Sequence, residues 1–291
     1  MPPWLDSLLT RLLAVHDAGR LPHALLIRAG VGWGETILAD RLALSLIGRT
    51  DVETARTLAH PDLKWVAPEG AIIKVDEIRE VGAFAVGTRQ SAPCKVVVVE
   101  SADLMNPSAA NALLKTLEEP PADTYLILSS SRPARLLPTI VSRCQSVTVV
   151  RDVPAARGWL LERWPEAEID EKLFECGDAP LAVHEALSCG EPVLAEVLPS
   201  LATGSPVSSA VAPLLEWDVD RLLSGWYRHC IALLAGDSRI PALGAGSAAE
   251  LALFSDELLS ARRQLLTTNS ANQRLLYERL ISRWQGAVRA H

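Results

Sequence analysis

The sequence predicts an α/β domain with a largely parallel sheet, followed by helical segments. Three observations lead to this prediction. Short aliphatic runs alternate with helical patterns up to about residue 150, a glycine-rich turn separates the first run from the next helix, and only helical patterns follow residue 151. Strand, glycine loop and helix open many nucleotide-binding domains, and alternation of strands with helices favours a parallel sheet covered by helices.

The elements of the first half follow from apolar spacing. Residues 4–17 carry leucines on one helix face, and residues 35–46 show a second helical pattern. A third helix is expected from Pro107, because Asn106 can cap it and proline at the first helical position lacks only a donor that would be unpaired anyway. The aliphatic runs predict strands over residues 23–27, 95–100, 124–128 and 146–150.

The second half predicts helices only. Three short helices are expected over residues 155–164, 168–176 and 179–187, and longer ones around 218–234 and 248–284. Residues 190–213, richer in Pro, Gly and Ser, are interpreted as a boundary, and residues 236–246 as a loop. The predicted domains are therefore residues 1–150, 151–189 and 190–291.

Composition limits the class of protein. The chain has 291 residues, of which 49% are hydrophobic and 22% charged, as in an ordinary globular protein of two or three domains. A net charge of −7 argues against a chain that grips nucleic acid by itself, although it is compatible with a subunit that shares DNA with more basic partners.

Nothing in the sequence predicts export or a membrane span. The longest aliphatic run, Val96–Val99, is short, and no positively charged leader precedes the first apolar residues. The five cysteines show no C-x-x-C spacing and are expected to be free thiols in the cytoplasm; they are Cys94, Cys144, Cys176, Cys189 and Cys230.

The glycine-rich turn departs from a working phosphate loop, G-x-x-x-x-G-K-[ST], at its lysine. The turn glycines Gly32 and Gly34 and the hydroxyl of Thr36 are kept, but Glu35 stands where the lysine would neutralise phosphate. A carboxylate facing a triphosphate in a partly desolvated site costs several kcal/mol as an order of magnitude. Trp33 also adds bulk beside the loop. The loop is therefore predicted to be a structural relic.

A second catalytic position has changed as well. ATPases of this kind end a later strand with an Asp–Glu pair that holds magnesium and acts on water. Here the pair is Glu100-Ser101. Because two independent positions have changed together, we expect no ATP hydrolysis by this chain alone.

Two strings identify a family. The string from Asn111 to Pro121, NALLKTLEEPP, followed by the triplet Ser142-Arg143-Cys144, resembles the clamp-loader subunits of the AAA+ superfamily over roughly residues 20–190. Within that family the gamma/tau type keeps the loop lysine, whereas the delta-prime branch of bacterial DNA polymerase III carries an acidic residue there. Glu35 and Ser101 match the delta-prime branch.

The resemblance implies a fold and a set of partners. The fold would be an AAA+ module, a small helical lid and an all-α collar that joins five subunits in a ring. The partners would be the gamma/tau and delta subunits, the sliding clamp, and primed DNA through the complex. The chain would thus be a replication component of a nucleotidyltransferase complex, not an enzyme on its own. Arg143 would reach the ATP of a neighbouring subunit as an arginine finger.

The resemblance also implies which ligands are missing. Many relatives carry a four-cysteine zinc module before a His-Pro-Asp stretch, but residues 47–59, which precede His60, contain no cysteine, so no zinc is expected. Where ATP-binding relatives place a sensing arginine in the lid, this chain has Leu181 or Ala182. No cofactor of its own is therefore expected.

Other interpretations stay open at this point. The chain could be an active NTPase of the gamma/tau type with an atypical loop, or a DNA-binding adaptor without a role in hydrolysis. Arg143 could form a salt bridge at the edge of the core, and Cys144 is expected to be a small buried residue and not a nucleophile. Glu118 and Glu119 are either solvated acids or a subunit contact.

Overall fold

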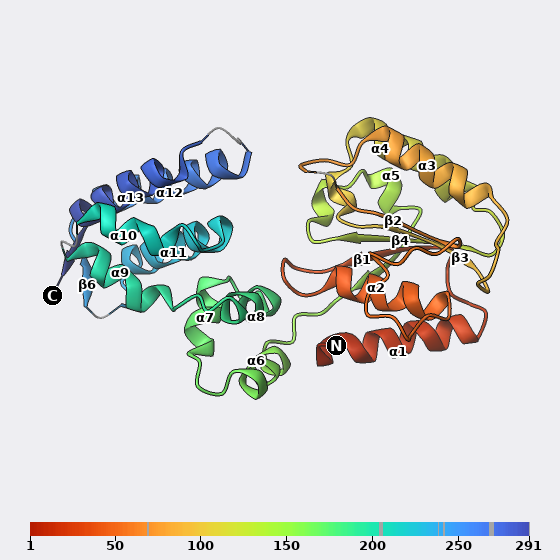
Figure 1. The fold of residues 1–291 in the computed structure, drawn as a ribbon, viewed down its shortest axis with the longest axis horizontal. Helices are drawn as coiled ribbons and strands as arrows, with labels where there is room; N and C mark the ends of the chain where they lie inside the picture. The colour runs from red at the N-terminus through yellow and green to blue at the C-terminus, as the bar shows by residue number, and fades with distance from the viewer. Residues whose placement is uncertain (69, 204–205, 238, 241, 268–270, 291) are drawn as a thin grey trace. The chain divides into compact units, whose positions relative to one another are not determined.

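The computed structural model describes residues 1–68, 70–203, 206–237, 239–240, 242–267 and 271–290. The chain divides into two compact units, Met1–Trp159 and Leu160–His291 (Figure 1). The division falls within helix α6 (Val153–Arg163). The further boundary expected at residues 189–190 stays a prediction.

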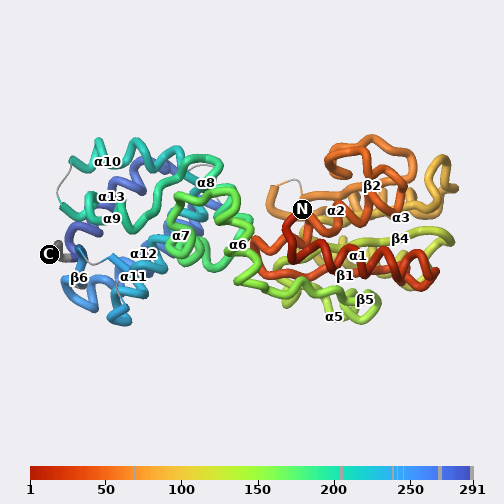
Figure 2. The backbone as a smooth tube through the Cα atoms, turned by 90° about the horizontal axis from the view of Figure 1, so that it is seen from below, coloured from red at the N-terminus to blue at the C-terminus, as the bar shows by residue number. Residues whose placement is uncertain are grey.

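A five-stranded parallel sheet forms the centre of the first unit. Its strand order is β2-β3-β4-β1-β5, and every neighbouring pair runs parallel. Figure 2 shows β2 and β5 at opposite edges, as this order requires. The strands are β1 (Ala24–Arg28), β2 (Leu63–Val66), β3 (Lys95–Val99), β4 (Thr124–Ser130) and β5 (Gln145–Thr148). The predicted parallel α/β fold is confirmed.

Helices cover both faces of this sheet. Figure 1 shows α1 (Pro3–Asp17) and α2 (Glu35–Leu46) on one face, with α3 (Val75–Val86) and α4 (Pro107–Glu118) on the other. All five residues of β3 are buried, which explains its nearly continuous run of valines. The predicted cap of α4 is confirmed, because Asn106 Oδ1 accepts a hydrogen bond from the Ala109 amide at 2.8 Å.

Short turns complete the first unit. They are the 3₁₀ helices η1 (Ala102–Leu104) and η2 (Pro133–Arg135) and the single-turn helix α5 (Pro138–Val141).

Besides these short turns, one strand and one longer helix of the first unit have no counterpart among the predicted elements. Strand β2 is a four-residue edge strand with two half-buried members, so it lacks the aliphatic run that marks β3. Helix α3 did leave a signal: its buried residues Ile78, Val81 and Ala85 are spaced along one helix face.

The second unit is mostly helical, as expected. Its helices are α7 (Ile169–Glu175), α8 (Pro180–Ser188), α9 (Leu194–Ala202), α10 (Val207–Leu214), α11 (Val219–Leu234), α12 (Ala248–Thr267) and α13 (Gln273–Ala287). Trp226, Phe254 and Trp284 meet in its core with ring centroids 5.5–5.6 Å apart.

Three details of the second half correct the sequence interpretation. The segment 190–213 is not simply a boundary, because it holds α9 and most of α10, each with an internal proline near its end. The segment 248–284 is two helices, and Asn272 caps the second by accepting from the Leu275 amide at 3.1 Å. The predicted loop 236–246 contains β6 (Leu243–Ala245), which pairs antiparallel with β7 (Val288–Ala290). Three-residue strands are too short to give a periodic signal.

Across the part of the chain that the structure describes, no helix combines the length and the apolar character that a membrane span needs.

Candidate functional site

The fold gathers the predicted loop and the predicted acidic pair at one edge of the sheet. The loop follows β1, the pair Glu100-Ser101 follows β3, and Ser129-Ser130 end β4, which lies between those two strands. The carboxyl ends of parallel strands are where α/β sheets bind ligands. The residues chosen from the sequence therefore lie together at the end of the sheet where such folds bind ligands.

The backbone of the loop adopts left-handed conformations at two positions, both of which are glycines. Gly32 has φ +73° and Gly34 has φ +92°, both in the left-handed region, and α2 begins directly after Gly34. A side chain at such a φ costs about 1–2 kcal/mol. The two glycines are therefore explained by the turn itself, whether or not phosphate binds.

Trp33 fastens this loop to the body of the unit. Its side chain is buried and meets the Trp4 ring edge-on at 5.6 Å, while Trp4 Nε1 donates to the Trp33 carbonyl at 3.0 Å. Trp4 also meets Trp159 edge-on. The expected bulk of Trp33 is therefore turned into the core, where it fixes the loop against α1.

The electrostatics of the loop are unfavourable for phosphate. Burial raises the pKa of Glu35, and the nearby carboxylates of Asp103 and Glu100 raise it further. Three acids thus lie around the position from which a lysine would reach the outer phosphates. Asp103, which the sequence reasoning missed, accepts a hydrogen bond from Ser130 Oγ at 2.6 Å.

Glu100 is already engaged inside the chain. Its Oε2 accepts a hydrogen bond from Trp65 Nε1 at 2.9 Å and lies 3.3 Å from Nε of Arg56. A guanidinium of the chain therefore stands beside the Glu100 carboxylate, the first acid of the pair that follows β3. No motif pointed to Arg56 or Trp65, since both lie in the segment between the recognisable strings.

Ser101 offers no acid–base group. It has a left-handed backbone, with φ +51°, and its amide donates to Ser129 Oγ at 3.3 Å. A hydroxyl cannot take a proton from water as a carboxylate can near neutral pH. The second acidic position is thus replaced by a residue that serves the turn after β3.

Arg143 lies just after α5, with its side chain 35% exposed. Its Nε and Nη2 atoms lie 2.8 and 2.5 Å from Glu118 Oε1, and Nη1 donates to the Thr139 carbonyl at 3.0 Å. Ser142 Oγ donates to the same carbonyl at 3.1 Å. The structure thus joins the two strings on which the family resemblance rested.

Cys144, the third residue of the triplet, is buried. Burial raises the pKa of its thiol to about 11, so the nucleophilic thiolate is scarce near neutral pH. This agrees with the expected role as a small core residue.

The His-Pro-Asp stretch is structural. Asp62 is buried, and its carboxylate accepts hydrogen bonds from the amides of Gln90, Ser91 and Ala92 at 2.7–2.8 Å. His60 Nδ1 accepts from the Asp62 amide at 3.1 Å. Among the described residues, no three His, Cys, Asp or Glu side chains are grouped as metal ligands would be.

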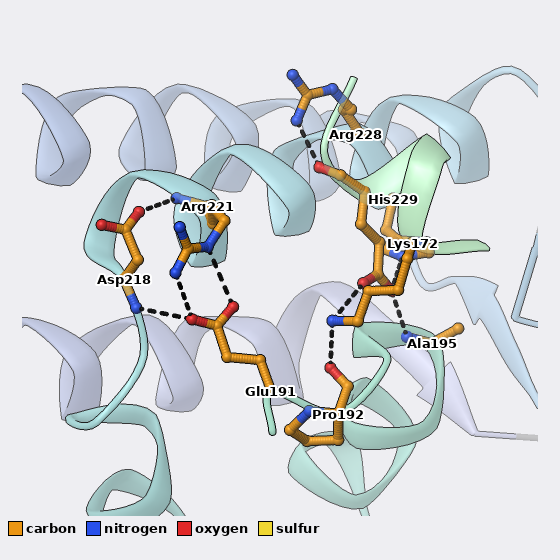
Figure 3. Close-up of polar contacts among 9 residues, drawn as sticks. Lys172, Glu191, Pro192, Ala195, Asp218, Arg221, Arg228 and His229 are labelled. Carbon is orange, nitrogen blue, oxygen red and sulfur yellow. Dashed lines mark hydrogen bonds and ion pairs between the residues drawn. The ribbon is translucent and has the colours of Figure 1, made fainter. Parts of the chain in front are cut away.

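The second unit contains a buried polar cluster that the sequence reasoning missed (Figure 3). Glu175 Oε1 accepts from the Ala195 amide at 3.1 Å and lies 3.2 Å from His229 Nε2. Lys172 Nζ lies 3.3 Å from the other carboxylate oxygen and donates to the Pro192 carbonyl at 2.6 Å. Glu175 therefore ties α7 to α11 and to the start of α9.

A second ionic contact strengthens the same region. Arg221 donates to Glu191 at 2.7 and 3.2 Å, and Asp218 caps α11 by accepting from the Arg221 amide (Figure 3). These contacts fix the chain between α8 and α9 against α11. The pairs Glu191–Arg221 and Glu175–His229 are 30 and 54 residues apart in sequence, so no local pattern indicated these contacts. Lys172 and Glu175, by contrast, are three positions apart on α7.

The parallel sheet, with the glycine loop after β1 and the pair Glu100-Ser101 after β3, has the arrangement of a nucleotide-binding α/β domain. Residues 5–152 match the family described as "DNA polymerase III, delta subunit". A Pseudomonas aeruginosa protein named DNA polymerase III subunit delta' is 34% identical over 323 residues, covering 97% of this chain and 96% of that protein. The chain therefore belongs to the family of DNA polymerase III delta-prime subunits.

Two further comparisons agree with this family. The Escherichia coli protein of the same name is 38% identical over 156 residues, which cover 49% of this chain and 47% of that protein. The crystal structure of a DNA polymerase III gamma subunit-related protein from Thermotoga maritima aligns with a TM-score of 0.51 at 18% identity, over 98% of this chain and 99% of that one. The second likeness supports the fold.

Proposed function

We propose that this chain is a subunit of the DNA polymerase III clamp loader that does not hydrolyse ATP and that donates Arg143 to ATP held by a neighbouring subunit. The observation that carries the first part is the engagement of Glu100 by Arg56 and Trp65. The carboxylate that would bind magnesium already contacts two side chains of the same chain. A magnesium–nucleotide complex would therefore have to displace the Arg56 guanidinium from Glu100.

The other changes act in the same direction. Glu35 brings a negative charge where a lysine would bind phosphate, and Ser101 cannot act on water. The isolated chain should bind ATP no tighter than about 1 mM, roughly −4 kcal/mol. The alternative, an active NTPase of the gamma/tau type, draws support from the retained glycines and from Thr36. Calorimetry separates the two, because micromolar affinity would overturn the proposal.

The role of Arg143 is supported by its surroundings. Its described partners lie on α4 and in the segment 139–142, and none belongs to the glycine loop or to the Glu100-Ser101 pair. The guanidinium is partly exposed and presents a planar fork of permanent charge. Such a fork can stabilise the charge that develops on the equatorial oxygens of a transferring γ-phosphoryl group.

The proposed assembly follows from the family. The gamma/tau subunits would bind the ATP, the delta subunit would complete the ring, and the ring would place the sliding clamp on primed DNA. With a net charge of −7, this chain would meet DNA through the complex.

The deciding experiment compares wild type with Arg143→Ala in the reconstituted loader. DNA-stimulated ATP hydrolysis should fall, although by less than the 10³–10⁵-fold that a transition-state arginine contributes at a single site, because only one of several sites loses it. Arg143→Lys should rescue poorly, because an ammonium lacks the fork. Unchanged turnover per assembled ring, together with a large loss of subunit stability, would make Arg143 a structural salt bridge.

A further inference from the structure

Glu118, the last residue of α4, holds Arg143 in one orientation. A single carboxylate oxygen, Oε1, lies 2.8 Å from Nε and 2.5 Å from Nη2. These two nitrogens form one side of the guanidinium plane. The Thr139 carbonyl accepts from Nη1, with Ser142 Oγ 3.5 Å from the same atom. The guanidinium is therefore held on one side by Glu118 of α4, and on the other by Thr139 of α5 and by Ser142, which follows α5.

This arrangement leaves one edge of the guanidinium, formed by Nη1 and Nη2, without an acceptor that both nitrogens share among the described residues. Nη1 and Nη2 form the outer edge of the fork. A bidentate contact with an oxyanion needs two such parallel N–H groups. The outer edge is thus the one that can receive phosphate oxygens while Glu118 stays in place.

We propose that Glu118 is a positioning residue, which orients the outer edge of Arg143 towards the γ-phosphate of a neighbouring subunit. The inference rests on the proposed trans-acting role of Arg143. Glu118 would not touch the nucleotide. It would remove in advance the rotational freedom of a long side chain, which otherwise has to be lost when the reacting groups are aligned.

A merely stabilising role fits the exposure of the pair poorly. The side chains are 35% and 49% exposed, and ion pairs between solvated groups contribute little to folding stability. The same exposure leaves the pair accessible to a second subunit. We therefore infer that the contact serves to orient the Arg143 side chain more than to stabilise the fold.

The test measures the Arg143-dependent part of ATP turnover, defined as the difference between loaders assembled with wild type and with Arg143→Ala. Glu118→Ala should remove most of this part, at the single-site level about tenfold to 10²-fold, as expected for a misplaced catalytic group. It should lower kcat and leave the KM for ATP nearly unchanged, because a trans-acting arginine works in the transition state. Glu118→Gln should retain part of the turnover, since its amide oxygen can still accept from Nε and Nη2.

Glu119→Ala is the matched control. Glu119 is the adjacent exposed acid and makes no contact with Arg143 in the described structure. The control should behave as wild type. The double variant Glu118→Ala/Arg143→Ala should be no slower than Arg143→Ala alone, because a positioning residue has nothing left to position.

The outcomes separate the inference from the proposed function. If Arg143→Ala leaves turnover unchanged, both are wrong. If Arg143→Ala slows turnover but Glu118→Ala does not, or if the double variant is clearly slower than Arg143→Ala, the positioning role alone is wrong. Thermal unfolding and the elution volume of the assembled ring are measured for every variant. If Glu118→Ala does not assemble, Glu118→Gln decides: turnover equal to wild type with an unchanged kcat overturns the inference, and a reduced kcat at full assembly supports it.

Discussion

The Nε atom of Arg56 lies 3.3 Å from the Oε2 atom of Glu100 at the carboxyl end of β3. The chain thereby places its own cation beside the first acid of the pair that follows β3. Under the proposed function, the absence of ATP hydrolysis therefore rests on more than the replacement of one lysine.

We expect Glu35→Lys to bind ATP better than wild type without hydrolysing it. The new ammonium can donate charge-assisted hydrogen bonds, each worth about 1.5–3 kcal/mol, so affinity should rise by roughly tenfold to a hundredfold. Turnover should stay at background because Ser101 and the Arg56–Glu100 pair are unchanged. Calorimetry and phosphate release measure the two quantities. Glu35→Gln separates removal of the negative charge from addition of the positive one, and steady hydrolysis by Glu35→Lys alone would contradict the prediction.

Asp62 should make stability depend on pH in the acid range. Burial would raise the pKa of this carboxyl, but hydrogen bonds from the amides of Ala92, Ser91 and Gln90 outweigh it and lower the pKa to about 2. An unfolded chain titrates aspartate near about 3.9, so the stabilisation is complete above that value and is lost as the pH falls through about 2. The loss should amount to at most about 2.6 kcal/mol.

Urea unfolding between about pH 5 and pH 2 measures this dependence. Asp62→Asn should be less stable than wild type at pH 7 and should show a flatter profile in the acid range. Asp17→Asn is the control, because the Asp17 side chain is 79% exposed. Equal slopes for wild type and Asp62→Asn would show that another group is responsible.

Glu175 should be among the costliest side chains to remove from the second unit. Glu175→Ala would leave Lys172 buried without its carboxylate, a change that typically costs 3–5 kcal/mol, i.e. about half of a typical domain's stability. The double variant Lys172→Met/Glu175→Met should recover much of that loss, since a buried pair can often be replaced by apolar groups of similar volume.

Chemical unfolding of the full chain, followed by tryptophan fluorescence, reports this loss through Trp226 and Trp284 in the core of the same unit. Glu278→Ala is the surface control: it removes one partner of an exposed ion pair with Arg274 and should change stability by less than about 1 kcal/mol. A loss of similar size for the two single variants would contradict the role assigned to Glu175.

The purified protein should contain no stoichiometric zinc. The cysteines are spread along the sequence, and burial raises the thiol pKa of Cys94 and Cys176 to about 11 and that of Cys230 to about 12, whereas zinc binds the thiolate. Elemental analysis after purification without chelators measures the content, and about one zinc per chain would contradict the expectation.

The strands and helices that were predictable are those whose signals are local. A few adjacent residues are enough to predict each of them. Examples are the valines of β3, the Asn106-Pro107 start of α4 and the glycines before α2. Edge strand β2, with two of its four residues half-buried, was missed because it lacks an aliphatic run. The strands β6 and β7 were missed because three residues are too few to show a period. The internal prolines of α9 and α10 concealed helices that tertiary packing stabilises.

The candidate site divides along the same line. Glu35, Glu100, Ser101 and Arg143 could be chosen from the sequence because motif spacing identifies them. Arg56 and Trp65 could not, since their importance comes from contacts with Glu100 that span 44 and 35 positions. The pairing of Glu118 with Arg143 has the same origin: each residue stood in a recognisable string, but only the fold shows that they touch.

In the turn before α2, the residues that the fold requires differ from the residues that nucleotide chemistry would require. Gly32 and Gly34 are required by backbone angles, and Trp33 is required by its packing against Trp4, so substitution at any of these three positions should be penalised in a chain that never meets ATP. Glu35 and Thr36 carry no such requirement. Evolutionary drift should therefore erase the chemistry of such a loop sooner than its shape, and a glycine pattern of this kind is a record of ancestry before it is a sign of nucleotide binding.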